Sequence, residues 1–191
     1  MKLFSVFLGG RADKCNTELH DVVFTLGEKI EDTYNDLLQK WFGVPDRLHI
    51  DSWVDLSIVE GYKISISKEK KKSDKKLYFV NLGAYEKNRF EELHESKFMV
   101  DVNKISVKKR AKELLLVGKE QVHLDDLYDV DDCIEIRKVS GFYINLEKTS
   151  KPGNLKFNNG YKPIPINIIK NFKKLQEKNR WYKNWRVVFT L

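Results

Sequence analysis

Short apolar runs alternate with polar turns along the first part of the chain, and their order occurs twice. The runs Leu3–Leu8 and Leu77–Leu82 each end at a glycine and predict buried β-strands. A second strand is predicted after each of them, at Leu19–Leu26 and Leu93–Val100. The spacing of these runs is the first sign that the chain contains two similar units.

A segment with helical periodicity follows each predicted strand pair. Apolar residues recur at helical spacing within residues 30–41, and Gly43 lies where a C-terminal cap is expected. Residues 107–115 show the same spacing, with Ser106 as the expected N-cap and Gly118 as the stop. One helix is therefore predicted in each unit.

Two further strands complete each unit. They are predicted at Leu48–Leu56 and Tyr62–Ile66, and again at Val122–Val130 and Phe142–Leu146. The sequence thus predicts an α+β fold made of two tandem ββαββ repeats. A single unit of this size buries little surface, so we expect the two to pack with pseudo-twofold symmetry.

The four histidines support an internal duplication. His20 and His94 are separated by 74 residues, and so are His49 and His123. With this offset the runs ELHDVVF and LHIDSW meet ELHESKF and VHLDDLY, and a six-residue insertion follows in the second copy. The predicted boundaries are 3–66 and 77–146, joined by a charged linker at 67–76.

The C-terminal part of the chain, residues 147–191, differs in charge from the rest. It carries 11 Lys and Arg against 2 Glu, whereas the preceding residues carry 24 basic against 26 acidic side chains. A loop is predicted at Thr149–Pro165, a helix at about Asn167–Lys178 and a final strand at Arg186–Leu191. We expect this basic extension to dock on the acidic repeats through the apolar face of its helix, which carries Ile168, Ile169, Phe172 and Leu175.

The paired motifs resemble a known bacterial family. The runs LFSVFLGG, ELHDVVF and LHIDSW, with their partners LYFVNLGA, ELHESKF and VHLDDLYDVDD, are similar to the family called domain of unknown function 1543. The resemblance covers roughly residues 1–146, in two copies. It implies no activity, because the family has none assigned.

Histidine and aspartate alternate on one of the predicted strands of each copy. Because side chains alternate along a strand, His49 and Asp51 share a face, as do His123 and Asp125. Either these pairs form a ligand-binding or acid–base site, or they belong to an ordinary solvated face. The full alternation puts Leu48, Ile50, Val54 and Leu56 on the core face and His49, Asp51, Trp53 and Asp55 on the other.

Glutamate and histidine form a second recurring pair. Glu18 and His20 lie on the face that continues with Val22, Phe24 and Leu26, and Glu92 and His94 repeat the pattern. We therefore expect both histidines to be half-buried at the edge of the core. They are either acid–base candidates or structural residues whose hydrogen bonds are satisfied by the backbone.

Other chemistry finds little support in the sequence. No local metal-chelating motif occurs, Cys15 and Cys133 do not form a Cys-x-x-Cys pair, and we expect no metal and no cofactor. The loop Gly9-Gly10-Arg11 could bind an anion through backbone N–H groups and Arg11, although glycines more often allow a tight turn. No nucleotide-binding or nucleophile motif is present.

The basic extension offers a different kind of site. Lysines and arginines interleaved with aromatic residues suit a phosphate backbone and stacked bases, and the same helix could simply pack on the repeats. The nucleic-acid candidates are Lys170, Lys173, Lys174, Lys178, Arg180, Trp181, Lys183 and Trp185.

Three functions remain open from the sequence. The first is a non-catalytic protein that binds a small ligand or a protein partner at a polar site near the junction of the repeats. The second is a small hydrolase- or isomerase-like enzyme with a Glu–His acid–base pair, and the third is nucleic-acid binding. No apolar run is long enough for a membrane helix and no signal segment is recognised, so we expect a cytoplasmic protein.

Overall fold

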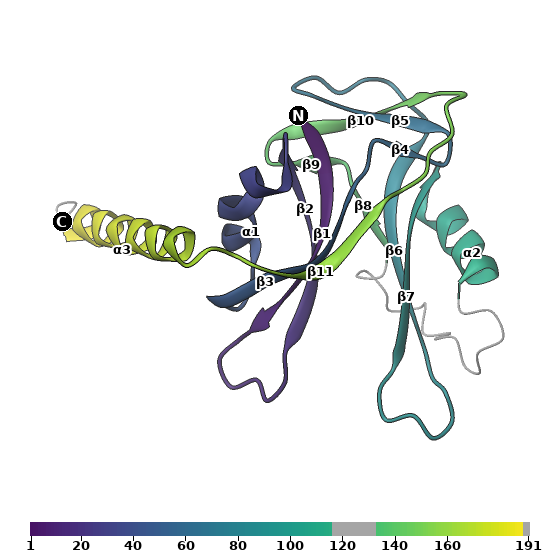
Figure 1. Ribbon diagram of the computed structural model, residues 1–191. Helices are drawn as coiled ribbons and strands as arrows, with labels where there is room; N and C mark the ends of the chain where they lie inside the picture. The colour runs from purple at the N-terminus through teal and green to yellow at the C-terminus, as the bar shows by residue number, and fades with distance from the viewer. Residues whose placement is uncertain (116–132, 189–191) are drawn as a thin grey trace. The chain divides into compact units, whose positions relative to one another are not determined.

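The computed structural model describes residues 1–115 and 133–188, with side chains up to residue 178 of the last helix. Two compact units make up the chain: unit 1 comprises residues 1–55 and 156–191, and unit 2 comprises residues 56–155. Both units contain antiparallel strands, and the described chain has three α-helices (Figure 1). The predicted α+β class is confirmed.

Unit 1 is built on a four-stranded antiparallel sheet. Its strands are β1 (Lys2–Arg11), β2 (Leu19–Gly27), β3 (Val44–Asp55) and β11 (Phe157–Pro163), arranged in the order β11-β3-β1-β2. The central strand β1 pairs with β2 and β3 along almost its whole length. Side chains on both faces of β1 are buried, which explains its nearly continuous apolar sequence.

One face of this sheet packs against helices. The 3₁₀ turn η1 (Ile30–Thr33) leads into α1 (Tyr34–Lys40), and α3 (Ile166–Val188) begins shortly after β11. Together they form an apolar core with alternate residues of β1. The buried members are Phe4, Val6, Leu8, Val23, Ile30, Tyr34, Leu37, Leu38, Trp41, Leu48, Ile50, Ile164 and Ile169.

The face that β2 turns toward this core differs from the prediction. Val23 is buried in the helix-covered core, and Leu19 packs against it. The expected core residues Val22, Phe24 and Leu26 are only partly buried and alternate with these two along the strand, so they belong to the opposite face. Both faces of β2 carry apolar side chains, and alternation alone does not tell which one the helices cover.

A β-bulge interrupts the predicted alternation on β3. Leu8 pairs with Ile50 but Phe7 pairs with Ser52, so Asp51 is the extra residue. Beyond the bulge Trp53 packs against the helix-covered core, and it no longer shares the face of His49 as predicted. The alternation is correct only as far as the bulge.

Two predicted helix boundaries are also corrected. Gly43 does not cap α1, which ends at Lys40; a Cβ at this position would lie 2.2 Å from the Arg11 carbonyl oxygen, so glycine permits the close approach of two backbones. In unit 2, Asn103 rather than Ser106 is the N-cap of α2 (Lys104–Leu114), and its side chain accepts a 2.9 Å hydrogen bond from the Ser106 N–H. The predicted stop at Gly118 lies outside the described residues.

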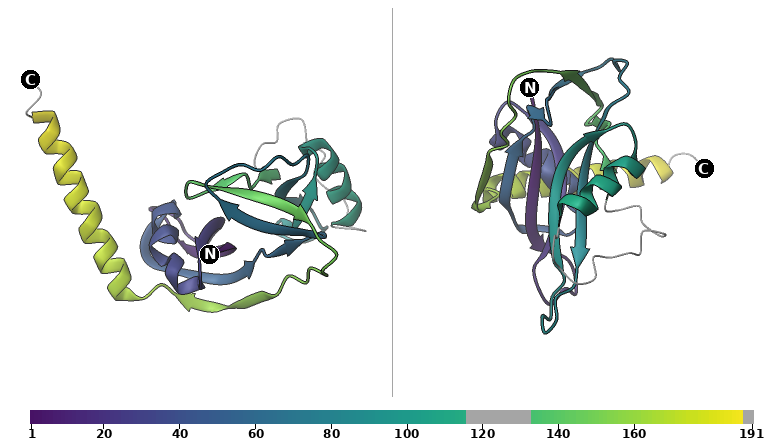
Figure 2. Two further views of the ribbon diagram at one scale, coloured as in Figure 1. Left: turned by 90° about the horizontal axis from the view of Figure 1, so that it is seen from above. Right: turned by 90° about the vertical axis from the view of Figure 1, so that its right-hand side faces the viewer.

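The C-terminal extension contains a strand where a loop was predicted and a helix where a strand was predicted. Residues 157–163 form β11, which pairs with the edge of β3 despite its Gly, Asn and Pro content. The helix α3 continues to Val188 as one rod (Figure 2), so residues 186–188 are helical. Neither α3 nor another helix in the described ranges has the length and apolar character needed to cross a bilayer.

Helix α3 docks on unit 1 through its first turns. Ile169 is buried there, and Ile168 and Phe172 pack against the same core. Lys173 forms an ion pair with Asp46, and Gln176 donates a 2.9 Å hydrogen bond to Gln39 of α1. Leu175, which was expected to join the buried stripe, is 60% exposed.

Unit 2 contains two sheets. The first has the order β7-β6-β8, from β7 (Leu93–Asp101), β6 (Lys76–Ala84) and β8 (Cys133–Glu135), and it packs against α2. The second has the order β4-β5-β10-β9, from β4 (Ile58–Val59), β5 (Tyr62–Ser67), β10 (Phe142–Lys148) and β9 (Lys138–Val139). The predicted strand Val122–Val130 lies outside the described residues.

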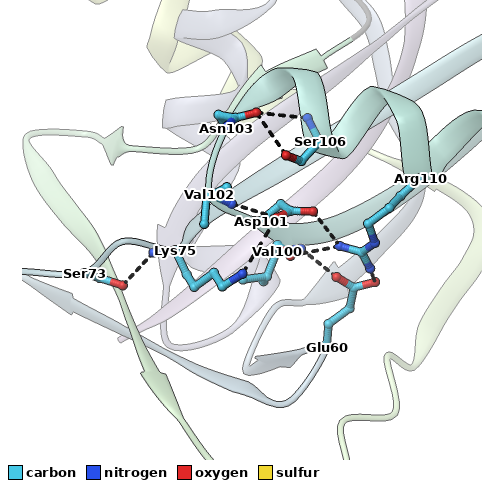
Figure 3. A network of polar contacts seen from close by, with 9 residues as sticks. All are labelled: Glu60, Ser73, Lys75, Val100, Asp101, Val102, Asn103, Ser106 and Arg110. Carbon is cyan, nitrogen blue, oxygen red and sulfur yellow. Dashed lines mark hydrogen bonds and ion pairs between the residues drawn. The ribbon is translucent and has the colours of Figure 1, made fainter.

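A polar network joins the turn of the β4–β5 hairpin to the α2 side of unit 2 (Figure 3). Glu60, in the left-handed region with φ +47°, accepts a 2.8 Å hydrogen bond from the Val100 N–H and a 2.7 Å one from Arg110. Arg110 also contacts Asp101 at 3.1 Å. Burial of the Asp101 carboxyl opposes its ionisation, but hydrogen bonds from Val102 and Arg110 outweigh this and lower its pKa.

Candidate functional site

His49 lies at the centre of a polar cluster in unit 1. It sits on β3 and is only 3% exposed, although it faces away from the helix-covered core. Its Nδ1 is 2.9 Å from the carbonyl oxygen of Arg47, a residue with φ +65°. Because a carbonyl only accepts hydrogen bonds, Nδ1 is the donor, and in the neutral ring Nε2 then carries the lone pair.

Two carboxylates surround the other ring nitrogen. His49 Nε2 lies 3.0 Å from Glu18 Oε1 and 3.3 Å from Asp51 Oδ1. The second Asp51 oxygen lies 3.4 Å from His20 Nε2 on β2 and has no hydrogen-bond partner. The side chains of Glu18, Asp51 and His20 are 46%, 30% and 43% exposed, so solvent and ligands reach the cluster from this side.

Gly9 makes room for this arrangement. It lies within β1, opposite His20 on one side and His49 on the other, and not in the turn that its sequence suggested. A Cβ there would lie 2.4 Å from His49 Nε2 and 2.6 Å from Asp51 Oδ2. A side chain at position 9 would therefore displace the imidazole from its partners.

Aromatic rings flank the two imidazoles. The Tyr161 ring of β11 lies 4.4 Å from the His49 ring, and the Phe7 ring stacks on the His20 ring at 5.2 Å. Tyr161 is 68% exposed and Phe7 is 40% exposed. Each imidazole of the cluster thus has a partly exposed aromatic neighbour.

The sequence anticipated four members of the cluster but not how they pair. Glu18 was expected beside His20 and instead contacts His49, whereas His20 contacts Asp51. Gly9 was interpreted as a turn residue, and Tyr161 lies in a segment taken for a loop. The position of Gly9 opposite His49 would have pointed to the site, but it can be recognised only once the register of β1 and β3 is known.

The other predicted binding residues are placed as follows. His94 Nε2 lies 3.5 Å from Glu92 Oε2, and the His94 side chain is 53% exposed. His123 and Asp125 lie outside the described residues. Arg11 ends β1 opposite Val44, and within residues 1–115 and 133–178 no contact joins it to the His49 cluster.

The nucleic-acid candidates divide into two groups. The side chains of Lys170, Lys174 and Lys178 are exposed on α3, whereas Lys173 is engaged with Asp46. The side chains of Arg180, Trp181, Lys183 and Trp185 lie outside the described part of the helix.

No cluster in the described residues meets the requirements of a metal site with three or more His, Cys, Asp or Glu ligands. In the His49 cluster, the carboxylate oxygens of Glu18 and Asp51 lie next to the Nε2 atoms of His49 and His20. The arrangement can accept hydrogen bonds from a ligand through Glu18 and Asp51, and it can exchange a proton at His49 Nε2 or His20.

Fold and site together define an antiparallel α+β protein with a buried imidazole held between carboxylates. Residues 15–66 match the family model described as Domain of Unknown Function (DUF1543), and this segment contains Glu18, His20, His49 and Asp51. The protein Il1583 from Idiomarina loihiensis, known from a crystal structure, is 31% identical, with a TM-score of 0.66 over 86% of this chain and 98% of that chain. Residues 15–66 therefore carry the DUF1543 match, and over most of its length the chain belongs to the same family as the Il1583 protein. No curated protein matches it.

Proposed function

We propose that the chain is a ligand-binding protein whose site is the His49 cluster, formed by Glu18, His20, His49 and Asp51. The observation that carries this proposal is the convergence of Glu18 and Asp51 on the nearly buried imidazole of His49, with His20 beside Asp51. Burying an imidazole beside carboxylates costs solvation free energy, and a site of this kind is more often kept for function than a solvated sheet face is.

The ligand is expected to donate hydrogen bonds and to carry positive charge. Glu18 and Asp51, whose side chains are 46% and 30% exposed, supply acceptor oxygens. The flanking rings of Tyr161 and Phe7 offer faces that attract cations. An organic ammonium or guanidinium group fits these features better than an anion does.

This proposal is tested by NMR titration of the full chain with small probes. Ethanolamine and guanidinium at millimolar concentration should shift the ring resonances of His20 and His49, whereas uncharged ethylene glycol should not. Glu18→Gln should weaken the response about tenfold, because a hydrogen bond to a charged group is worth roughly 1.5–3 kcal/mol. Glu18 is half exposed, so the variant should still fold.

The matched control is Glu177→Gln, which removes the same charge from an exposed position on α3. It should bind like the wild type. The ligand-binding proposal fails if no probe moves the histidine resonances, or if the two variants respond equally.

An enzyme remains the second candidate because of the way His49 is held. The Arg47 carbonyl fixes Nδ1 as a donor, which leaves Nε2 to accept a proton next to Glu18. A hydrolase- or isomerase-like activity would require His49→Gln to abolish turnover of a model ester without changing the melting temperature. Turnover that survives this substitution would rule out His49 as the base.

We also propose that residues 3–66 and 77–146 are duplicated units joined by the linker 67–76, with the extension 147–191 docked on them. Three kinds of feature support the duplication. The β6–β7 register repeats the β1–β2 register at an offset of 74 residues. Lys76 contacts Glu135 as Lys2 contacts Asp55. The left-handed residues Lys14 and Glu60 have counterparts in Asn88 and Ser140.

The pairing of β5 with β10 agrees with a pseudo-twofold relation between the copies. Ser65 lies opposite Asn145, which is its counterpart at an offset of 80 residues, and Ile64 and Ile66 lie opposite Leu146 and Ile144. Such reciprocal pairing is the pattern of an isologous contact. The β4–β5 hairpin of the first copy would then complete the sheet of the second.

A further inference from the structure

Unit 2 contains a cavity lined by basic residues. Part of its lining comes from the predicted linker 67–76, which the sequence indicated only as a charged connection between the repeats. The cavity has a volume of about 60 Å³. A single water needs about 10–15 Å³ measured in this way, so the space admits a group of several heavy atoms. Residues of segment 70–76 form one part of the lining, and residues of β6, β8, β10 and the β8–β9 connection form the rest.

The lining is strongly cationic. Five basic residues are among those that line the cavity, against one acidic residue, Glu135, and the rest of the lining is mostly apolar. The basic residues are Lys70, Lys71, Lys75, Lys76 and Arg137.

Acidic neighbours engage only some of these cations. Lys71 pairs with Glu147, whose pKa is lowered chiefly by the hydrogen bond from Lys71. Lys76 lies 3.2 Å from Glu135, and Lys75 lies 3.7 Å from Asp101 in the network of Figure 3.

Lys70 and Arg137 have no ion pair within residues 1–115 and 133–178. A flexible ammonium and a planar guanidinium are therefore available to an incoming anion.

Asn145 holds the linker wall in place. This side chain is 4% exposed and accepts a 2.8 Å hydrogen bond from the Lys71 N–H. Its amide group donates 3.0 Å hydrogen bonds to Ser67 Oγ and to the Glu69 carbonyl oxygen. The connector is thus fixed to β10 on both sides of Lys70, and the cavity does not depend on a free loop.

We infer that this cavity is a binding site for a phosphate group carried by a small ligand. The volume suits one tetrahedral anion, and the guanidinium of Arg137 provides the forked donors that such an anion prefers. Lys70, which also lines the cavity, adds a point charge. The site lies wholly within unit 2 and does not involve the His49 cluster.

The inference is tested by calorimetric titration of the full chain with inorganic phosphate and pyrophosphate. Saturable binding is expected for at least one of them, and sodium chloride at the same ionic strength should not imitate it. The double variant Lys70→Gln/Arg137→Gln should bind at least about tenfold more weakly, since each charge-assisted hydrogen bond contributes on that scale. Both residues are exposed, so its melting temperature should stay near that of the wild type.

The matched control is Lys72→Gln/Lys151→Gln, which removes the same charge from exposed positions that do not line the cavity. It should bind within about twofold of the wild type, because exposed charges act at a distance only weakly. Equal loss in both double variants, or the absence of saturation, would overturn the inference. Glu18→Gln should leave phosphate binding unchanged, so this test is independent of the His49 cluster.

A short single-stranded oligonucleotide provides the remaining arm of the test. If it binds and the loss follows Lys170→Gln/Lys174→Gln rather than the cavity variant, the basic helix is the anion site and the cavity is not. If pyrophosphate competes with the oligonucleotide, and the Lys70→Gln/Arg137→Gln variant binds neither of them, the phosphate site is supported.

Discussion

The strand trio β2-β1-β3 of unit 1 and the trio β7-β6-β8 of unit 2 share a register but differ in what they hold. In each, a glycine of the central strand lies opposite a histidine, Gly9 opposite His20 and Gly83 opposite His94. In unit 1, β3 extends as far as His49 and brings a second imidazole to Gly9, whereas the corresponding His123 lies outside the described residues. Glu18 and His20 are themselves partly exposed, so in unit 1 it is the pairing of β3 with β1 that brings the buried His49 into the cluster.

The largest expected effect comes from filling the space at Gly9. In Gly9→Ala the new methyl group would lie 2.4 Å from His49 Nε2, and the ring is anchored at Nδ1. We expect a loss of about 1–3 kcal/mol in the free energy of unfolding, typical of overpacking, together with loss of probe binding. Urea denaturation and the histidine NMR signals measure the two effects.

A double-mutant cycle identifies the cause of that loss. If the clash is with the imidazole, Gly9→Ala/His49→Ala should cost clearly less than the sum of the two single changes. Strict additivity would show that position 9 is sensitive for some other reason, and the close approach of His49 to Gly9 would lose its importance.

The sequence predicted the frame of the fold and named the groups of this cluster, and its failures have physical causes. Strands β1, β2, β6 and β7 follow from their apolar periodicity. β11 was missed because its stability comes from pairing with the edge of β3 rather than from its own Gly- and Asn-rich residues.

The pairing of Glu18 with His49 was missed for a related reason. The two residues are distant in the sequence and meet only through the register of three strands and the bulge at Asp51. Sequence motifs show neighbours along the chain, and the adjacent Glu18 and His20 were therefore paired first.

An intermediate effect on the free energy of unfolding is expected at Phe4 and Tyr78, where the two strand trios differ by one hydroxyl group. Phe4 and Tyr78 hold equivalent positions, opposite Asp55 and Glu135, and both are buried. The Tyr78 hydroxyl has no hydrogen-bond partner, a condition that costs about 1–3 kcal/mol. Tyr78→Phe should therefore stabilise the protein and Phe4→Tyr should destabilise it, as measured by urea denaturation.

The same tyrosine gives a pH signature. Burial, and then the nearby Glu135, raises the pKa of Tyr78 from 10.0 to about 12. The unfolded chain loses this proton first, so the wild type should lose stability relative to Tyr78→Phe as the pH rises from 10 to 12. A constant difference between the two proteins over this range would mean that the hydroxyl is solvated.

The smallest effect is expected from the ion pairs that the trios have in common. Lys2 lies 2.9 Å from Asp55, and Lys76 lies 3.2 Å from Glu135, with all four side chains partly exposed. Exposed pairs contribute little, so Asp55→Asn and Glu135→Gln should each lower the urea midpoint only slightly, and 1 M salt should remove the difference.

The hydrogen bond from Lys2 to Asp55 and the Asp55 charge raise the Lys2 pKa, so Asp55→Asn should lower the Lys2 pKa in an NMR titration. Because the proposed duplication predicts the same local environment for both carboxylates, the two substitutions should have similar salt dependence. If salt changes the urea midpoint clearly for one variant and not for the other, the two ion pairs differ in electrostatic environment although they occupy the same position in the strand register.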